Sequence, residues 1–77
     1  MEEAEREQLR QAVFKATNDA ILADDAWQAE LDLSGIDRYT TAARQQPVLR
    51  SLYDAKLAAD KRMRQAIETL RGREVPR

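Results

Sequence analysis

The chain has 77 residues, a formal net charge of −1, and neither cysteine nor histidine. This length allows one small domain, which buries only about 60% of its unfolded surface and is marginally stable alone. Without cysteine or histidine, we expect no disulfide, no thiolate nucleophile and no structural zinc site. Self-association or a partner protein is the expected source of further stability, and a well-packed monomer is the alternative.

Acidic and basic residues are sorted along the chain. Residues 1–38 carry ten acids and four bases, whereas residues 39–77 carry four acids and nine bases. The two halves can therefore pair within one chain, pair head-to-tail with a second copy, or offer one pole to a charged partner. The sequence does not choose among these arrangements.

The start of the chain is acidic and lacks the apolar segment of a signal peptide. Its longest strictly apolar run, residues 20–23, is far shorter than the ~20 residues that span a bilayer. Neither of the two long segments that are predicted below to be helical, residues 2–23 and 47–71, combines large apolar residues with a cleanly basic opposite face. We therefore expect a cytoplasmic protein with no membrane partner.

The first predicted helix covers residues 2–23, with glutamates in its opening turns, where the helix dipole favours them. At 100° per residue, one narrow apolar stripe consists of Leu9, Val13, Ala16, Ala20 and Ala23. Phe14 and Ile21 form a second apolar line, roughly 120–140° around the helix from Leu9. One neighbouring helix cannot cover both lines, so we expect contacts on two sides of this helix.

Residues 24–46 are expected to form a partly helical connector. Asp24 or Asp25 is a candidate N-cap of a short second helix; the alternative is one helix that continues to residue 33 and ends at Gly35. Asp37 is a candidate N-cap of a further short helix. Pro47 disfavours the α conformation at the residue before it, which predicts a break there.

The clearest pattern lies between residues 47 and 71. A heptad a/d register, broken only by a lysine, consists of Leu49, Leu52, Lys56, Ala59, Met63, Ala66 and Leu70. Replacing Leu52 or Leu70 with alanine is expected to cost ~2–5 kcal/mol, whereas Lys56→Leu is expected to be neutral or stabilising. Gly72 is expected to end this helix, which leaves residues 73–77 as a tail on a single domain over residues 1–72.

These elements predict an all-α fold, either a helical hairpin or a small three-helix bundle, with the two long helices antiparallel and in coiled-coil-like contact. The second apolar line of the first helix favours association, and two hairpins together would make a four-helix bundle.

Enzymatic function is not expected. The serine and threonine hydroxyls have no histidine to activate them, and no Ser-x-x-Lys motif occurs. The acids around Gly35 do not alternate as in a calcium loop and lack its closing glutamate. The sequence therefore predicts no catalytic, cofactor, metal or small-molecule site.

Trp27 lies in a segment that also holds Leu31 and Tyr39. Tryptophan and tyrosine are favoured at interface hot spots, whereas the competing interpretation is that this cluster closes one end of the core. The candidate protein interface consists of Phe14, Ile21, Trp27, Leu31 and Tyr39. We expect a small non-catalytic interaction protein, namely an assembly factor, a structural subunit or a docking inhibitor, of the kind that phages and mobile elements often encode.

The alternative is a nucleic-acid-binding accessory protein that uses Arg62, Arg64, Arg71 and Arg73. Acids interrupt this basic half, and a run of alternating charges at i, i+4 spacing, typical of a solvated salt-bridge ladder, consists of Lys56, Asp60, Arg64 and Glu68. The slightly negative net charge also argues against a dedicated nucleic-acid-binding domain. Nucleic acid is therefore the less favoured partner.

Overall fold

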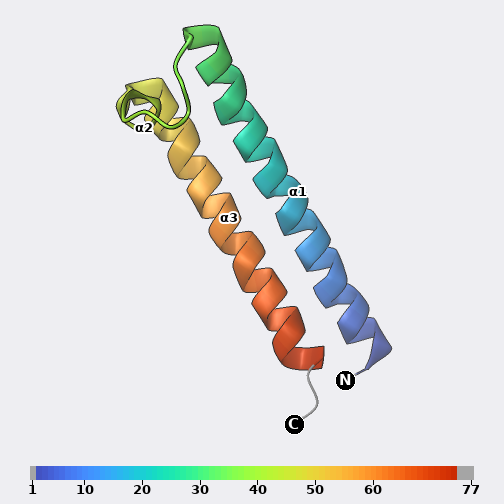
Figure 1. Ribbon diagram of the computed structural model, residues 1–77. Coiled ribbons are helices and arrows are strands. Elements are labelled where there is room, and N and C mark those ends of the chain that lie inside the picture. The colour runs from blue at the N-terminus through green and yellow to red at the C-terminus, as the bar shows by residue number, and fades with distance from the viewer. Residues whose placement is uncertain (1, 75–77) are drawn as a thin grey trace.

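The computed structural model describes residues 2–74. Two long helices, α1 (Glu3–Ser34) and α3 (Pro47–Glu74), lie side by side and run in opposite directions (Figure 1). The connector between them contains the short helix α2 (Ala42–Gln45). No residue in the described range lies in a strand, so the prediction of an all-α fold is confirmed.

Helix α1 is continuous, so the interpretation in which a second helix begins at Asp24 or Asp25 is wrong. The helix ends in a Schellman motif at Gly35, whose φ of +66° is left-handed. The amide of Gly35 donates to the Asp32 carbonyl at 3.4 Å, and the amide of Ile36 donates to the Leu31 carbonyl at 3.1 Å. These two bonds satisfy carbonyls that the end of the helix leaves open, so the predicted stop at Gly35 is confirmed.

Alanine substitutions at the two glycines are expected to change stability in opposite directions. An added Cβ would meet no atom within 4 Å at either position, so the backbone alone decides the sign. Gly35→Ala is expected to lower the free energy of unfolding by about 1–2 kcal/mol, because a left-handed L-residue is strained. Gly72 lies inside α3, so Gly72→Ala should raise it by roughly 0.5–1 kcal/mol. Urea denaturation measures both changes, and equal signs would contradict the assigned backbone conformations.

The connector differs from its prediction in detail. Asp37 caps a turn rather than a helix, since its Oδ1 accepts a hydrogen bond from the Tyr39 amide at 2.9 Å. Helix α2 begins only at Ala42. Gln46 has an extended conformation, with φ −60° and ψ 138°, which confirms the predicted break before Pro47. Pro47 is the first residue of α3, a position where its missing amide hydrogen costs no hydrogen bond.

The core lies between α1 and α3 and is richest beside the connector. The buried hydrophobic side chains in the described range are Ala20, Trp27, Leu31, Ala43, Leu49 and Ala59. Four of them form one cluster, against which other apolar side chains pack; the cluster consists of Trp27, Leu31, Ala43 and Leu49. Half of the buried residues are alanines, so the core holds little apolar volume away from this cluster.

The apolar stripe of α1 that contains Leu9 and the heptad register of α3 both face away from solvent. Leu9, Val13, Ala16 and Ala23 of α1 are half-buried, and every position of the heptad register in α3 is buried or half-buried. Helix α3 continues through Gly72 to Glu74, so the predicted stop at Gly72 is wrong. The physical reason is that Gly72 does not adopt a positive φ. The remainder of the predicted tail, residues 75–77, lies outside the described residues.

Candidate interaction sites

The residues predicted as a protein interface do not form one surface. Trp27 is 3% exposed and Leu31 is fully buried, and both belong to the core cluster. Their position agrees with the interpretation in which Trp27 closes the core, and a partner cannot reach them in this conformation. Phe14, Ile21 and Tyr39 are 76%, 53% and 85% exposed.

Phe14 and Ile21 define what we call the outer line of α1. Both side chains are exposed, so the connector does not cover this line. Leu22 is similarly exposed, at 59%, but points about 100° away from Ile21 around the helix. The outer line is therefore an apolar surface separate from the stripe that packs against α3.

The Trp27 side chain contacts three other parts of the chain. Its Nε1 donates a hydrogen bond to the carbonyl oxygen of Ala43 in α2 at 3.0 Å. Its ring centroid lies 5.0 Å from that of Tyr53 in α3, at an interplanar angle of 51°. The guanidinium carbon of Arg38, from the connector, lies 5.0 Å from the ring centroid. One side chain of α1 thus contacts the connector, α2 and α3.

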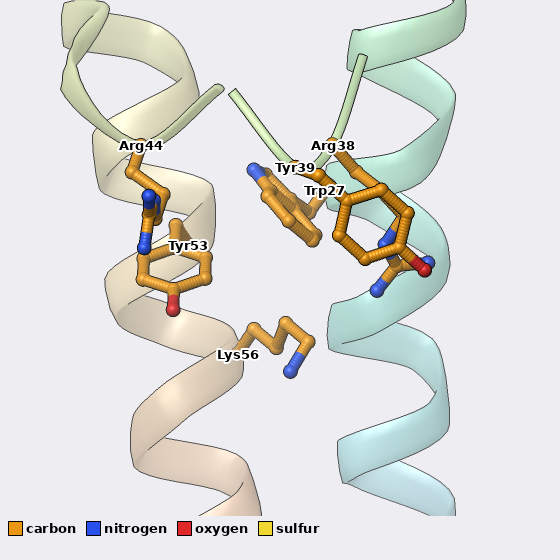
Figure 2. A pocket seen from close by; sticks show the side chains of 6 residues that line it. All are labelled: Trp27, Arg38, Tyr39, Arg44, Tyr53 and Lys56. Carbon is orange, nitrogen blue, oxygen red and sulfur yellow. The ribbon is translucent and has the colours of Figure 1, made fainter. Parts of the chain in front are cut away.

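A shallow cleft lies beside Trp27, between α1, the connector and α3 (Figure 2). Its volume is about 240 Å³, below the ~300–1,000 Å³ typical of ligand pockets. The lining combines aromatic and cationic side chains and contains no carboxylate; it consists of Trp27, Arg38, Tyr39, Arg44, Tyr53 and Lys56. The cleft has no histidine or cysteine to serve as a base or a nucleophile.

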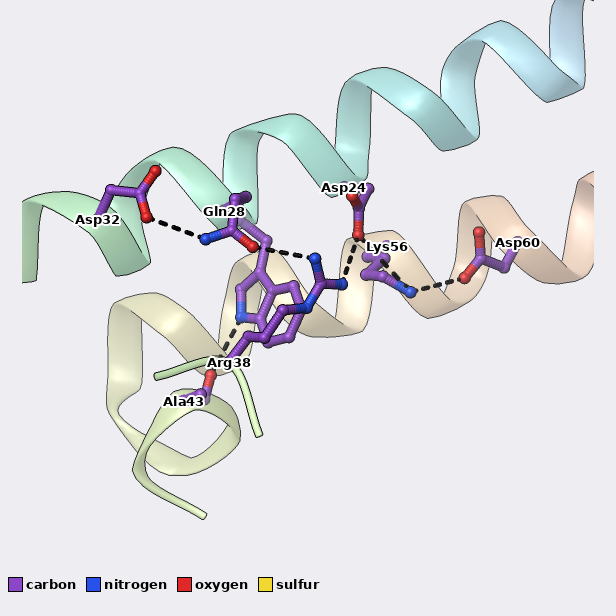
Figure 3. A network of polar contacts seen from close by, with 8 residues as sticks. Asp24, Gln28, Asp32, Arg38, Ala43, Lys56 and Asp60 are labelled. Atoms are coloured by element: carbon purple, nitrogen blue, oxygen red, sulfur yellow. Dashed lines mark hydrogen bonds and ion pairs between the residues drawn. The ribbon is translucent and has the colours of Figure 1, made fainter. Parts of the chain in front are cut away.

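A polar network borders this cleft (Figure 3). Oδ1 of Asp24 accepts a hydrogen bond from Nη2 of Arg38 at 3.2 Å and lies 3.9 Å from Nζ of Lys56. Lys56 also contacts Oδ2 of Asp60 at 2.9 Å, and Arg38 donates to Oε1 of Gln28 at 2.9 Å. Sequence reasoning included the i, i+4 pair of Lys56 and Asp60 but missed Asp24 and Arg38. No local pattern identifies them, because their contact joins residues 14 positions apart.

The ion pairs of Lys56 do not reverse the expected effect of Lys56→Leu on the free energy of unfolding. The Lys56 side chain is 18% exposed and its carboxylate partners are 23% and 35% exposed, so each ion pair is worth about 0–1 kcal/mol. A leucine in the heptad register gains roughly the same amount or more through burial. We expect urea denaturation to give Lys56→Leu an unfolding free energy equal to or above that of wild type. Lys61→Leu, at an exposed position, is the control and should change little; a loss above ~2 kcal/mol at Lys56 alone would show that the network is cooperative.

The four arginines predicted to contact nucleic acid are exposed but do not form one patch. At 100° per residue, Arg62 and Arg73 point to one flank of α3, and Arg64 and Arg71 point to the other. Nη1 of Arg73 also contacts Oε1 of Glu5 in α1 at 2.8 Å. This pair joins the acidic and basic halves of the chain at the end away from the connector.

Among residues 2–74, no group of three or more acidic side chains is placed to bind a metal ion. No helix within the same range is long and apolar enough to cross a membrane. Comparison with family models, curated proteins and solved structures found no match.

Proposed function

We propose that this chain is a small non-catalytic interaction protein of the cytoplasm, an assembly factor, structural subunit or docking inhibitor, that binds a protein through the outer line of α1. The supporting observation is the exposure of Phe14 and Ile21, at 76% and 53%, on a helix whose other apolar stripe is already packed. Full burial of a side chain of either type contributes about 1.5–3 kcal/mol. An exposed pair of this kind, one heptad apart, suits a second helix laid along it.

Self-association is one way to cover the outer line. Two helical hairpins that meet through their α1 helices would form a four-helix assembly, which adds apolar burial to a core that contains only a few large side chains. A different protein with an apolar helix would serve equally, and the proposal covers both.

Neighbouring substitutions test the outer line. Ile21→Gln should weaken partner binding about 10- to 100-fold, through loss of 1.5–3 kcal/mol of apolar burial. Leu22→Gln is the matched control, because Leu22 has similar exposure on the same turn but points elsewhere, and it should leave binding unchanged. The measurement is affinity capture from the native cell with quantitative mass spectrometry, together with sedimentation equilibrium of the purified chain. Equal effects of the two substitutions would contradict the proposal.

The same capture, run with and without nuclease, tests nucleic acid as the partner. Binding through several arginines should fall by ~0.9 decade per phosphate contact for each decade of salt. Partners that survive nuclease, and that a variant with Arg62, Arg64, Arg71 and Arg73 changed to glutamine retains, support the proposal. Loss of every partner both after nuclease treatment and in the four-arginine variant would replace the proposed protein binding with nucleic-acid binding.

A further inference from the structure

We infer that the outer line binds a second copy of this chain, with the two α1 helices antiparallel and Phe14 of each copy on Ile21 of the other. The inference rests on the proposed function, because it names the partner of the same surface. A twofold contact requires a surface that is complementary to itself. On the outer side of α1, a reversed second copy places Phe14 against Ile21 and Arg10 against Asp25.

Like any face of a regular helix, the outer side of α1 maps onto itself when the helix is reversed about a midpoint, so the side chains that then meet are what matters. At 100° per residue, the side chains within about 50° of the outer line are Glu3, Glu7, Arg10, Phe14, Thr17, Asn18, Ile21, Asp25, Gln28 and Asp32. Reversing the helix about the point between Thr17 and Asn18 places every member of this set opposite another member. Phe14 then lies opposite Ile21, and Thr17 lies opposite Asn18. No shift of the helix is needed to bring the apolar side chains together.

Charge complementarity selects the antiparallel orientation. In this register Arg10 of each copy lies opposite Asp25 of the other, and Glu7 lies opposite Gln28. A parallel, in-register pair would instead place Arg10 on Arg10 and Asp25 on Asp25, which is repulsive at both positions. The antiparallel pair has two unfavourable contacts, Glu3 with Asp32 at each end, and both are exposed, where salt screens charges over about 8 Å.

The geometry of α1 also limits the shape of the assembly. The outer line lies roughly 120–140° from the stripe that packs against α3, whereas a square four-helix bundle needs contacts about 90° apart. The two α1 helices therefore form the centre of an open arrangement, and each α3 flanks its own α1.

None of the residues that the contact uses is buried in the single chain, so substitutions there should leave the chain folded.

Single cysteines test the register without background, because the chain has none of its own. In the antiparallel pair, residue 10 lies beside residue 25 of the second copy and about 22 Å along the axis from residue 10 of that copy. A mixture of Arg10→Cys and Asp25→Cys chains, treated with a short bismaleimide linker, should give at least tenfold more cross-linked dimer than either variant alone. Lys15→Cys, on the far flank of α1, is the control and should not cross-link with either.

Charge reversal tests the same contact by sedimentation equilibrium. Arg10→Asp and Asp25→Arg should each weaken self-association roughly tenfold, because each creates two like-charge contacts in the dimer. An equimolar mixture of the two variants should recover the wild-type association, because the mixed dimer restores opposite charges at both contacts. A purely structural defect in either variant would not be rescued by mixing.

Each remaining result overturns the inference in a recognisable way. Cross-links within the Arg10→Cys variant alone would show a parallel pair. A wild-type chain that stays monomeric across the micromolar range would exclude the second copy as the occupant. The proposed function fails separately, when Ile21→Gln and Leu22→Gln chains capture partners equally.

Discussion

Replacing Trp27 with alanine is expected to unfold most of the chain at room temperature. Truncating a buried aromatic side chain costs ~3–5 kcal/mol, and a domain of this size rarely has more stability than that. Trp27 is 3% exposed and contacts Ala43, Tyr53 and Arg38, so the loss removes contacts among all parts of the fold. Far-UV circular dichroism during urea titration measures the change.

Trp27→Phe separates the hydrogen bond of the indole from its packing. The phenyl ring retains most of the apolar contact but leaves the Ala43 carbonyl without its donor, which costs about 1–3 kcal/mol. A Trp27→Ala chain as stable as wild type would show that the tryptophan is not part of the core. Its role as an exposed anchor for a partner would then be the better interpretation.

Leu49→Ala is expected to cost ~2–5 kcal/mol, whereas Leu70→Ala in the same heptad register should cost less, about 1–2 kcal/mol. Leu49 is 1% exposed within the core cluster, and Leu70 is half-buried near the far end of the helix pair. The heptad pattern alone predicts similar costs at Leu52 and Leu70, because spacing does not report depth. Thermal and urea unfolding measure both variants.

The expected difference between Leu49→Ala and Leu70→Ala can be contradicted directly. Equal costs at Leu49 and Leu70 would mean that the end away from the connector is packed as tightly as the end beside it. Hydrogen exchange on the wild-type chain provides an independent check. Amides near Leu70 should exchange faster than those of Leu52 and Tyr53, which pack against the core cluster.

The features that sequence predicted correctly depend on local geometry. Helical spacing identified the α1 stripe and the heptad register, and the special backbone of Gly35 and the restriction before Pro47 located the two breaks. The caps alone leave open whether α1 continues past Asp25, because an aspartate can cap a helix or lie within one. The stripe that continues through Trp27 and Leu31 was the signal that would have decided it.

The features that sequence did not predict depend on contacts between distant residues. Arg38 stacks on Trp27 and bonds to Asp24, and neither contact has a spacing rule. At Gly72 a local rule gave the wrong prediction, because a glycine ends a helix only when its backbone leaves the helical region. Of the candidate interface, the exposed line of Phe14 and Ile21 was predictable from helical geometry, whereas the burial of Trp27 was not.

The position of the core cluster also bears on how the chain folds. The hydrogen bond between Trp27 and Ala43 joins residues only 16 apart, so forming the cluster closes a short loop at a small entropic cost. Helix pairs with contacts this local have low contact order and fold quickly. Folding should begin at the bend, and the two helices should then zip together toward Glu5 and Arg73. The ends away from the connector join last and open first, so the ion pair of Glu5 and Arg73 forms only after the register between the two helices is set.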